Sequence, residues 1–447
     1  MRKRIFFFLI IMLYQLGGNI PGVLAESLRI YGKGGAGDWE NPAFHEMYPS
    51  ITIEYSENLG VINASDLTTV LLTREAYDIY AISFSNSNFT SVINKGYALD
   101  LSQESKLNER LEKTYKFLYE PLSRSSAIYG IPISITCSQW GISYNVWNTV
   151  NDETRFDIPS NYDELLNFIE WWIEDGQYEY TNVRLLKNSE DVKRDIVDLL
   201  VKHLLDIAWK EKNGNILQSQ DVENLFQRID SIDFGKLSKT VIDDSGEYNE
   251  YIFDIAFNWF EIEEYEGDRS FSPLLLNISE NIDLAIPIDM RIMFVNPATH
   301  SCKAAIDYLL CYLECRDDVY NILIYDEKHD PVENPYIRNQ IKLAEDELKK
   351  IQASDDTQFT YEADQLINKI NKLENMKWLV TYDKICQYQS ISQILFVREY
   401  NPVYMNDPDG SSGINKIIES FSQEKLSCHQ LCSELYRMFR YAFLENL

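Results

Sequence analysis

Short apolar runs alternate with amphipathic stretches along the first part of the chain. The runs typical of strands lie at 28–31, 51–55, 79–82, 128–136 and 141–146. Between the second and third of them, residues 67–73 show the spacing of a helix. Strands that alternate with helices at this interval predict an α/β domain with a mostly parallel sheet.

The pattern continues in the second part of the chain. Helix-like apolar spacing is found at 161–173, within 190–230, at 304–313 and at 427–444. Strand-like runs occur at 253–260, 284–289 and 292–295. A chain of 447 residues is long enough for two or three domains with substantial cores.

Residues 336–376 break the alternation. Two apolar stripes at helical spacing flank the polar joint 353–360. The first stripe consists of Ile337, Ile341, Ala344, Leu348 and Ile351, and the second of Leu366, Ile370 and Leu373. This pattern predicts an antiparallel helical hairpin whose charged outer faces lie in solvent.

The N-terminal segment has the features of an export signal. Arg2, Lys3 and Arg4 precede an apolar run over 5–14, and Val23-Leu24-Ala25 fits the small-x-small pattern of a signal-peptidase site. We predict a signal peptide over 1–25, cleavage after Ala25, and a secreted, extracellular or cell-surface protein (periplasmic in a Gram-negative cell). An uncleaved membrane anchor is the alternative.

Charge and cysteine content narrow the class of partner. The chain has 70 acidic and 41 basic residues and a net charge of −29, which argues against nucleic acid or an anionic membrane as a partner. Seven cysteines in a chain with ample apolar residues indicate buried free thiols more than a disulfide framework.

Several segments, in order, resemble family 1 extracellular solute-binding proteins of bacterial ABC importers, the group that includes the maltose-binding type. They are "MYPSITIEY" (47–55), "LLTREAYDIYAIS" (71–83), "KGYALDLS" (95–102), "IYGIPISITCSQWGISYNVW" (128–147) and "AIPIDMRIMFVNPATHSCKAAIDYL" (285–309). Each segment is a loose match, and the order and spacing make the assignment specific. The hairpin and the missing lipobox cysteine depart from the family pattern.

The resemblance implies two α/β lobes joined by hinge strands, a ligand held in the cleft between them, and delivery to ABC permease subunits in the membrane. It implies a lobe one of 26–138 with 288–317 and a lobe two of 139–287 with 318–447, from which the hairpin projects. We expect a monomer that binds a small molecule, an oligosaccharide by preference, with a polyamine as the alternative ligand.

Ligand-binding residues are expected where strands end in such a cleft. Indole rings stack on sugar rings, and polar neighbours bind hydroxyl groups. The candidates are Asp38, Trp39, Ser83, Ser85, Gln139, Trp140, Asn258, Trp259, Asp289 and Arg291. For Trp140 and Trp259 the alternative is a core role, and for Asp289 and Arg291 it is a hinge ion pair with each other.

Other chemistries find little support in the sequence. Gly32, Gly34 and Gly37 form G-x-G-x-x-G after a strand, but an export signal argues against a nicotinamide cofactor. Cys428, His429 and Cys432 are too few for a metal site, and 407–410 lacks the calcium-binding glutamate. We therefore expect no cofactor, no metal and no catalytic residues. A secreted glycoside hydrolase, with two carboxyl groups about 5–9.5 Å apart, is the competing hypothesis.

Overall fold

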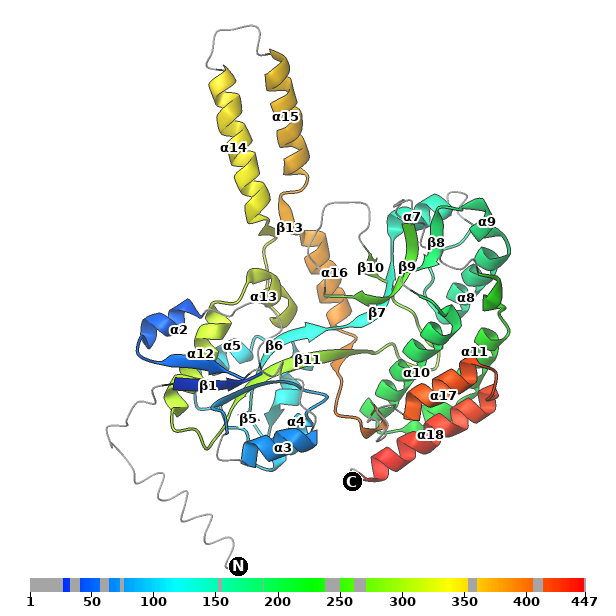
Figure 1. The fold of residues 1–447 in the computed structure, drawn as a ribbon, viewed down its shortest axis with the longest axis horizontal. Helices are drawn as coiled ribbons and strands as arrows, with labels where there is room; N and C mark the ends of the chain where they lie inside the picture. Colours follow the sequence, from blue (N-terminus) through cyan, green and yellow to red (C-terminus); the bar gives the residue numbers. More distant parts are fainter. Residues whose placement is uncertain are drawn as a thin grey trace, which may run out of the picture.

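The computed structural model describes residues 27–32, 41–56, 64–72, 76–151, 155–187, 189–237, 250–260, 271–352, 360–404 and 413–445. This part of the chain forms two lobes, each with its own β-sheet, and a long helical hairpin that projects from them (Figure 1). The predicted two-lobe α/β fold with hinge strands and a helical hairpin is confirmed. The predicted signal peptide lies outside the described residues.

Lobe one is built on a six-stranded mixed sheet. Its strands are β1 (Ser27–Tyr31), β2 (Thr52–Tyr55), β3 (Ile79–Ser83), β6 (Ile131–Thr136), β11 (Ile286–Val295) and β14 (Leu395–Val397), in the order β14-β11-β3-β1-β2 with β6 paired to β11. β1 runs parallel to β2 and β3, while β11 runs antiparallel to both β3 and β6. The predicted strands 284–289 and 292–295 are therefore one continuous strand.

Both faces of this sheet are buried, because successive side chains of a strand point to opposite faces. Ile82 and Ile292 belong to the apolar cluster that includes residues of α4 (Phe89–Asn94) and α16 (Tyr382–Ser392). Ala81 and Met293 belong to the cluster that includes residues of α2 (Pro42–Met47) and α12 (Cys302–Glu314). Continuous apolar strands are what a sheet covered on both sides requires.

Lobe two is built on a four-stranded sheet with one large core. Its strands are β7 (Ser138–Ile142), β8 (Val183–Leu186), β9 (Glu250–Asn258) and β10 (Ser272–Pro273), in the order β10-β7-β9-β8. Its main helices are α7 (Tyr144–Val150), α8 (Tyr162–Trp171), α10 (Val192–Lys210), α11 (Gln220–Asp230), α17 (Gly413–Ser422) and α18 (Cys428–Glu445). The predicted strand 141–146 is wrong beyond Ile142, because Val146, Trp147 and Val150 bury one helical face.

Shorter elements complete the described chain. They are α3 (Ala64–Leu72), α5 (Ser105–Leu111), α6 (Lys116–Tyr119), η1 (Glu120–Leu122), β4 (Ser123–Arg124), β5 (Ala127–Ile128), η2 (Trp172–Gly176), α9 (Gln177–Glu179), η3 (Gly214–Gln218), η4 (Phe234–Lys236), α13 (Asp318–Ile324), β12 (Val332–Glu333), β13 (Trp378–Val380) and η6 (Pro402–Tyr404). None of the described helices is long and apolar enough to cross a membrane.

Within the described residues, the chain passes between the lobes three times. It leaves the lobe-one sheet after β6 and enters the lobe-two sheet at β7, with Cys137 between them. It returns between β10 and β11, and it leaves again after β14 toward η6 and α17. These passages form the hinge region.

The structure corrects the predicted extent of lobe two. Residues 318–397 were assigned to it, but α13, α16 and β14 contribute to a lobe-one cluster, and the Tyr388 hydroxyl donates to the Leu323 carbonyl at 2.7 Å. These elements carry the apolar side chains that cover one face of β11 and extend its sheet. Of the described residues after 317, only those after β14 join the lobe-two core.

The hairpin consists of α14 (Pro335–Gln352) and α15 (Thr360–Glu374). Its base is the antiparallel pair of β12 and β13, which lies in the chain between α13 and α16. It therefore projects from lobe one and not, as predicted, from lobe two (Figure 1).

The cysteines carry free thiols, as expected from the sequence. Those of Cys137, Cys311, Cys428 and Cys432 are buried, and the last two belong to the lobe-two core. Burial raises the pKa of Cys432 to about 12, so this thiol is a core group rather than a reactive one.

Candidate functional site

The carboxyl ends of four lobe-one strands lie at one edge of the sheet. β1, β2 and β3 are parallel, and β6 has the same direction because both β3 and β6 are antiparallel to β11. The end of β6 leads directly into lobe two. Ligands of open α/β sheets bind outside such an edge, so the space between this edge and lobe two is the candidate site.

Polar side chains gather at this edge in two adjacent rows. The first row places Ser83 of β3, Arg291 of β11 and Ser134 of β6 side by side in register. In the second row, Asp289 of β11 lies opposite Thr136 of β6. Asp289 and Arg291 are two residues apart on one strand, so their side chains leave the same face of the sheet.

Hydrogen bonds connect the rows to the segment after β3. The Ser85 hydroxyl donates to the Asp289 carboxylate at 3.2 Å, and the hydroxyl groups of Ser83 and Ser85 are 3.3 Å apart. Four of the predicted site residues, Ser83, Ser85, Asp289 and Arg291, therefore come together. The Asp289 side chain is 44 % exposed and has oxygen lone pairs for a further donor.

A guanidinium ties this edge to lobe two. Arg398, which directly follows β14, donates to Asp289 at 2.6 Å and to Asp206 of α10 at 2.8 Å. Asp206 also accepts a hydrogen bond from the Tyr404 hydroxyl at 2.8 Å, and its side chain is 1 % exposed. Asp289 forms its ion pair with Arg398, whereas the sequence suggested Arg291 as its partner.

Burial governs the protonation of the groups around this ion pair. Burial raises the pKa of Asp206, although Arg398 and Tyr404 act in the opposite direction. Burial also acts to lower the pKa of Arg398, but Asp206 and Asp289 outweigh it and raise it. One turn before Asp206, burial lowers the pKa of His203 to about 4, and its ring nitrogen lies 2.7 Å from the Ala285 carbonyl oxygen.

A cavity of about 370 Å³ adjoins Arg398 between the lobes. Lobe one contributes residues of α6, η1 and β14, and lobe two contributes the last turn and a half of α10. The lining residues are Phe117, Glu120, Pro121, Asp206, Trp209, Lys210, Leu395, Phe396, Val397, Arg398 and Glu399. The lining thus places aromatic rings beside carboxylates and cations.

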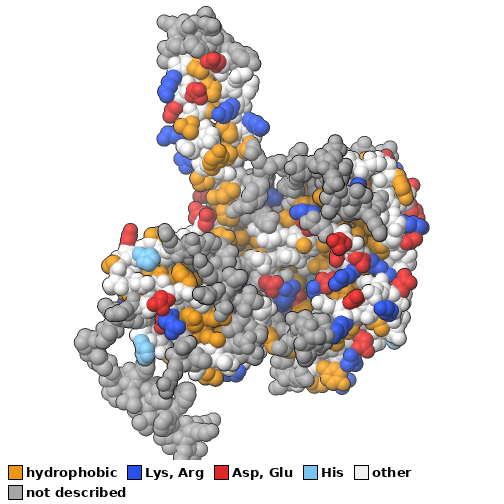
Figure 2. All heavy atoms as spheres, viewed as in Figure 1, with side chains coloured by type: hydrophobic (Ala, Val, Ile, Leu, Met, Phe, Trp, Pro, Cys, Tyr) orange, Lys and Arg blue, Asp and Glu red, His pale blue; other side chains and the backbone are white. Residues whose placement is uncertain are grey.

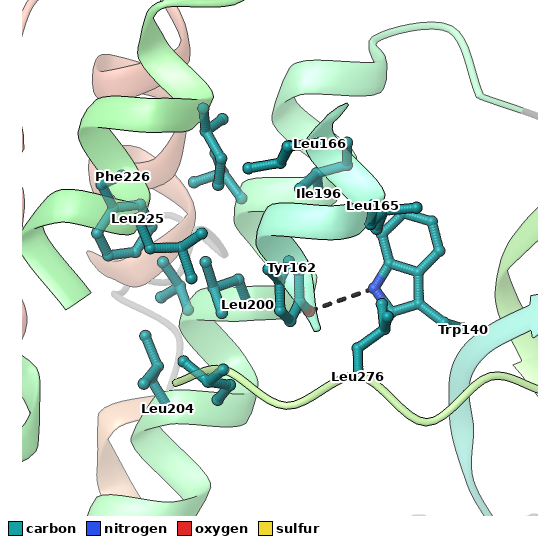
Figure 3. Packing of buried hydrophobic residues seen from close by; sticks show 14 of the residues in the cluster. Trp140, Tyr162, Leu165, Leu166, Ile196, Leu200, Leu204, Leu225, Phe226 and Leu276 are labelled. Atoms are coloured by element: carbon teal, nitrogen blue, oxygen red, sulfur yellow. Dashed lines mark hydrogen bonds between the residues drawn. The ribbon is translucent and has the colours of Figure 1, made fainter. Parts of the chain in front are cut away.

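Two of the three predicted tryptophans, Trp140 and Trp259, lie elsewhere. Trp140 is 2 % exposed, packs in the lobe-two core, and donates its indole N–H to the Tyr162 hydroxyl at 3.2 Å (Figure 3). Trp259 is 3 % exposed and donates to the Trp140 carbonyl at 2.8 Å. The structure thus places both in packed surroundings, in agreement with the core alternative, and a sugar contact by either stays a prediction.

The other lobe-two candidates lie beside the hinge. Gln139 is buried on β7, and the Asn258 carboxamide accepts a hydrogen bond from the backbone N–H of Cys137 at 3.2 Å. Asn258 thus supports the first passage between the lobes. Asp38 and Trp39 lie outside the described residues. Gly32, before them, has a φ of 85°, a left-handed conformation that favours glycine.

Sequence reasoning missed Asp206, Trp209, Phe396, Arg398 and Tyr404. Arg398 had a usable signal, since it is a charged residue directly after a short apolar strand. The remaining residues gave no local signal. Asp206 and Trp209 lie on α10, and Arg398, the partner of Asp206 across the hinge, is 192 residues further along the chain.

Known proteins resemble this chain in fold and not in sequence. No protein-family model and no curated protein sequence matches the chain. Among solved structures, the galacto-N-biose-/lacto-N-biose I-binding protein of the ABC transporter from Bifidobacterium longum is similar over 94 % of this chain and 97 % of that one, with a TM-score of 0.55 and 12 % identity. The chain shares the two-lobe fold of ABC-transporter sugar-binding proteins.

Two further structures show the same likeness. The cyclic α-maltosyl-1,6-maltose binding protein from Arthrobacter globiformis covers 94 % of this chain and is itself covered to 99 %, with a TM-score of 0.54 and 11 % identity. The GacH receptor of Streptomyces glaucescens, solved in complex with acarbose, is similar over 94 % of this chain and 98 % of that one, with a TM-score of 0.53 and 10 % identity. At these identities the likeness concerns the fold, and it extends over both lobes.

Proposed function

We propose that this chain is an exported, non-catalytic solute-binding protein that captures an oligosaccharide between its lobes and delivers it to ABC permease subunits. The observation that carries this proposal is the meeting of polar residues from both lobes at the carboxyl edge of the lobe-one sheet. Asp289 and Asp206 come from different lobes and bind the same guanidinium. The Bifidobacterium longum and Arthrobacter globiformis proteins that share the fold are sugar-binding proteins by name, which supports the same class of ligand.

The local charge favours a neutral ligand over a polyamine. A dication needs a site dominated by carboxylates and ring faces. Here Arg291 and Arg398 stand beside Asp289 at the sheet edge, so the acidity of the whole chain is not concentrated there. Figure 2 agrees with a dispersed charge, since acidic and basic side chains are mixed over the visible face of lobe two.

The same arrangement favours binding over hydrolysis. A glycosidase needs one carboxyl group free to donate a proton and a second one opposite to it. Asp206 and Asp289 are instead both bound to Arg398, which fixes them as hydrogen-bond acceptors. We propose that these two carboxylates orient ligand groups and take part in no reaction. We also propose that the protein acts as a monomer outside the cytoplasmic membrane.

Titration calorimetry of residues 26–447 against oligosaccharide and polyamine panels tests the proposal. We expect micromolar binding of an oligosaccharide that changes little between low and physiological salt, because neutral hydrogen bonds and stacking are weakly screened. Polyamine binding that collapses with salt, without sugar binding, contradicts the carbohydrate proposal and leaves the fold intact.

A further inference from the structure

A continuous chain of polar contacts runs from the lobe-one edge into lobe two. It passes from Ser85 to Asp289 at 3.2 Å, from Asp289 to Arg398 at 2.6 Å, and from Arg398 to Asp206 at 2.8 Å. Tyr404 extends it, because its hydroxyl lies 2.8 Å from Asp206 and 2.9 Å from the Lys202 carbonyl oxygen. This chain of polar contacts thus joins the candidate ligand site to α10.

Arg398 is fixed to lobe one at one end of this chain. Its backbone N–H donates to the Ile288 carbonyl at 2.8 Å, which continues the pairing of β14 with β11. Its guanidinium then binds Asp289 of β11 through one nitrogen. A planar guanidinium has further donors in a fixed geometry, and here another of them, Nε, points to the opposite lobe.

Asp206 is fixed to lobe two at the other end. It lies on α10, whose residues Leu204 and Leu205 are fully buried in the lobe-two core. Its own carboxylate is almost completely enclosed. A buried carboxylate without a cationic partner is strongly unfavourable, so a rotation of lobe two that separates Asp206 from Arg398, and leaves it only the Tyr404 hydroxyl, carries a high free-energy cost.

We propose that Arg398 is a positioning residue that couples the ligand site to the angle between the lobes. Through Asp206 it holds the ligand-free protein in the interlobe geometry of this structure, and through Asp289 it sets the orientation of a carboxylate that faces the ligand. A ligand hydroxyl that donates to Asp289 shares that carboxylate with Arg398, so ligand binding and lobe orientation influence one another. The ligand part rests on the proposed function, whereas the interlobe part does not.

Small-angle X-ray scattering without ligand tests the interlobe part. Asp206→Asn removes the charge at the lobe-two end, and Tyr404→Phe removes only the hydroxyl. We expect a larger radius of gyration for Asp206→Asn and a smaller increase for Tyr404→Phe, with a single cooperative unfolding transition retained in both. Scattering curves of both variants that superimpose on the wild-type curve overturn the proposal.

Arg228→Gln serves as the matched control. Arg228 of α11 binds Glu170 of α8 through two nitrogens, so it is also an arginine–carboxylate pair, but both partners belong to lobe two. If Asp206→Asn acts through the connection between the lobes, Arg228→Gln leaves the interlobe angle unchanged. An equal expansion in Arg228→Gln identifies general loosening and contradicts the proposal.

A double-mutant cycle tests the coupling. Calorimetry against the oligosaccharide found in the panel measures the coupling in Asp206→Asn, Asp289→Asn and the double variant. We expect the affinity loss of the double variant to differ at least fivefold from the product of the two single losses. Additive losses overturn the coupling. Absence of sugar binding by the wild type instead defeats the proposed function, and the scattering experiment still decides the interlobe part.

Discussion

The two lobes use their aromatic and polar residues in different ways. Lobe two packs its rings into one continuous core, where Trp140, Tyr162 and Phe253 are neighbours and Trp147 lies against Phe168 with ring centroids 4.6 Å apart. Lobe one covers both faces of its sheet with apolar residues and leaves polar side chains at the edge next to the hinge. The comparison teaches that a tryptophan near a strand end packs in a core here, while the polar residues at the edge of the lobe-one sheet form the candidate site.

The largest effect should come from the core of lobe two. We expect Trp140→Ala to lower the free energy of unfolding by about 3–5 kcal/mol, because it removes a fully buried indole and leaves a cavity. Trp140→Phe is the matched control, since it keeps a ring beside Phe253 and loses the bond to Tyr162, at a cost of about 1 kcal/mol. Urea unfolding measures both. A stable Trp140→Ala variant that no longer binds sugar would reverse the comparison between the lobes.

Acid should weaken the contact between α10 and the hinge. The pKa of His203 falls to about 4 in the folded protein because the ring is buried, whereas an unfolded histidine has a pKa of about 6.5. The unfolded chain therefore takes up a proton first, and stability is lost as the pH falls from about 6.5 to 4. The full effect is about 3 kcal/mol.

His203→Asn isolates this effect. The asparagine side chain stays neutral at every pH, so the variant lacks the histidine contribution to the pH dependence. The raised pKa of Asp206 acts in the opposite direction and is present in both proteins. Unfolding measured at several pH values should show a shallower acid slope in His203→Asn than in the wild type. Equal slopes would mean that the imidazole is not held neutral between α10 and Ala285.

The polar edge of lobe one should affect binding more than stability. We expect Asp289→Asn to lower the oligosaccharide affinity tenfold to a hundredfold, or about 1.5–3 kcal/mol, because a hydrogen bond to a charged acceptor is lost. Glu434→Gln, inside α18 of lobe two and paired with Arg437, is the control for removal of a negative charge. Calorimetry measures both variants, and unchanged affinity in Asp289→Asn would remove this residue from the site.

The smallest effect should come from the hairpin. The Asn334 backbone N–H donates to the Lys377 carbonyl at 2.7 Å, so a short Gly/Ser bridge can replace residues 336–376 without moving the base. Because α14 and α15 pack mainly against each other, we expect affinity to stay within threefold, or about 0.7 kcal/mol. Lost binding in a folded deletion variant would show that the hairpin belongs to the site.

The sequence by itself determined most of the elements, their order and the lobe-one residues of the candidate site. Alternation and helical spacing are local properties, so the strands near 28–31 and 79–82 and the hairpin stripes could be read from neighbouring residues. Ser83 and Ser85 were predictable because they end or follow the apolar strand β3. Asp289 and Arg291 lie inside β11, opposite the ends of β6 and β3.

Only the tertiary structure decided the lobe membership of 318–397, the burial of the tryptophans and the partner of Asp289. An apolar face of a helix fits either lobe, and a ring at a strand end can turn to the core or to the cleft, so local pattern leaves both choices open. The pairing of Arg398 with Asp206 spans 192 residues along the chain. Such a contact depends on how two separately folded sheets meet at the hinge, which no periodicity in the sequence records.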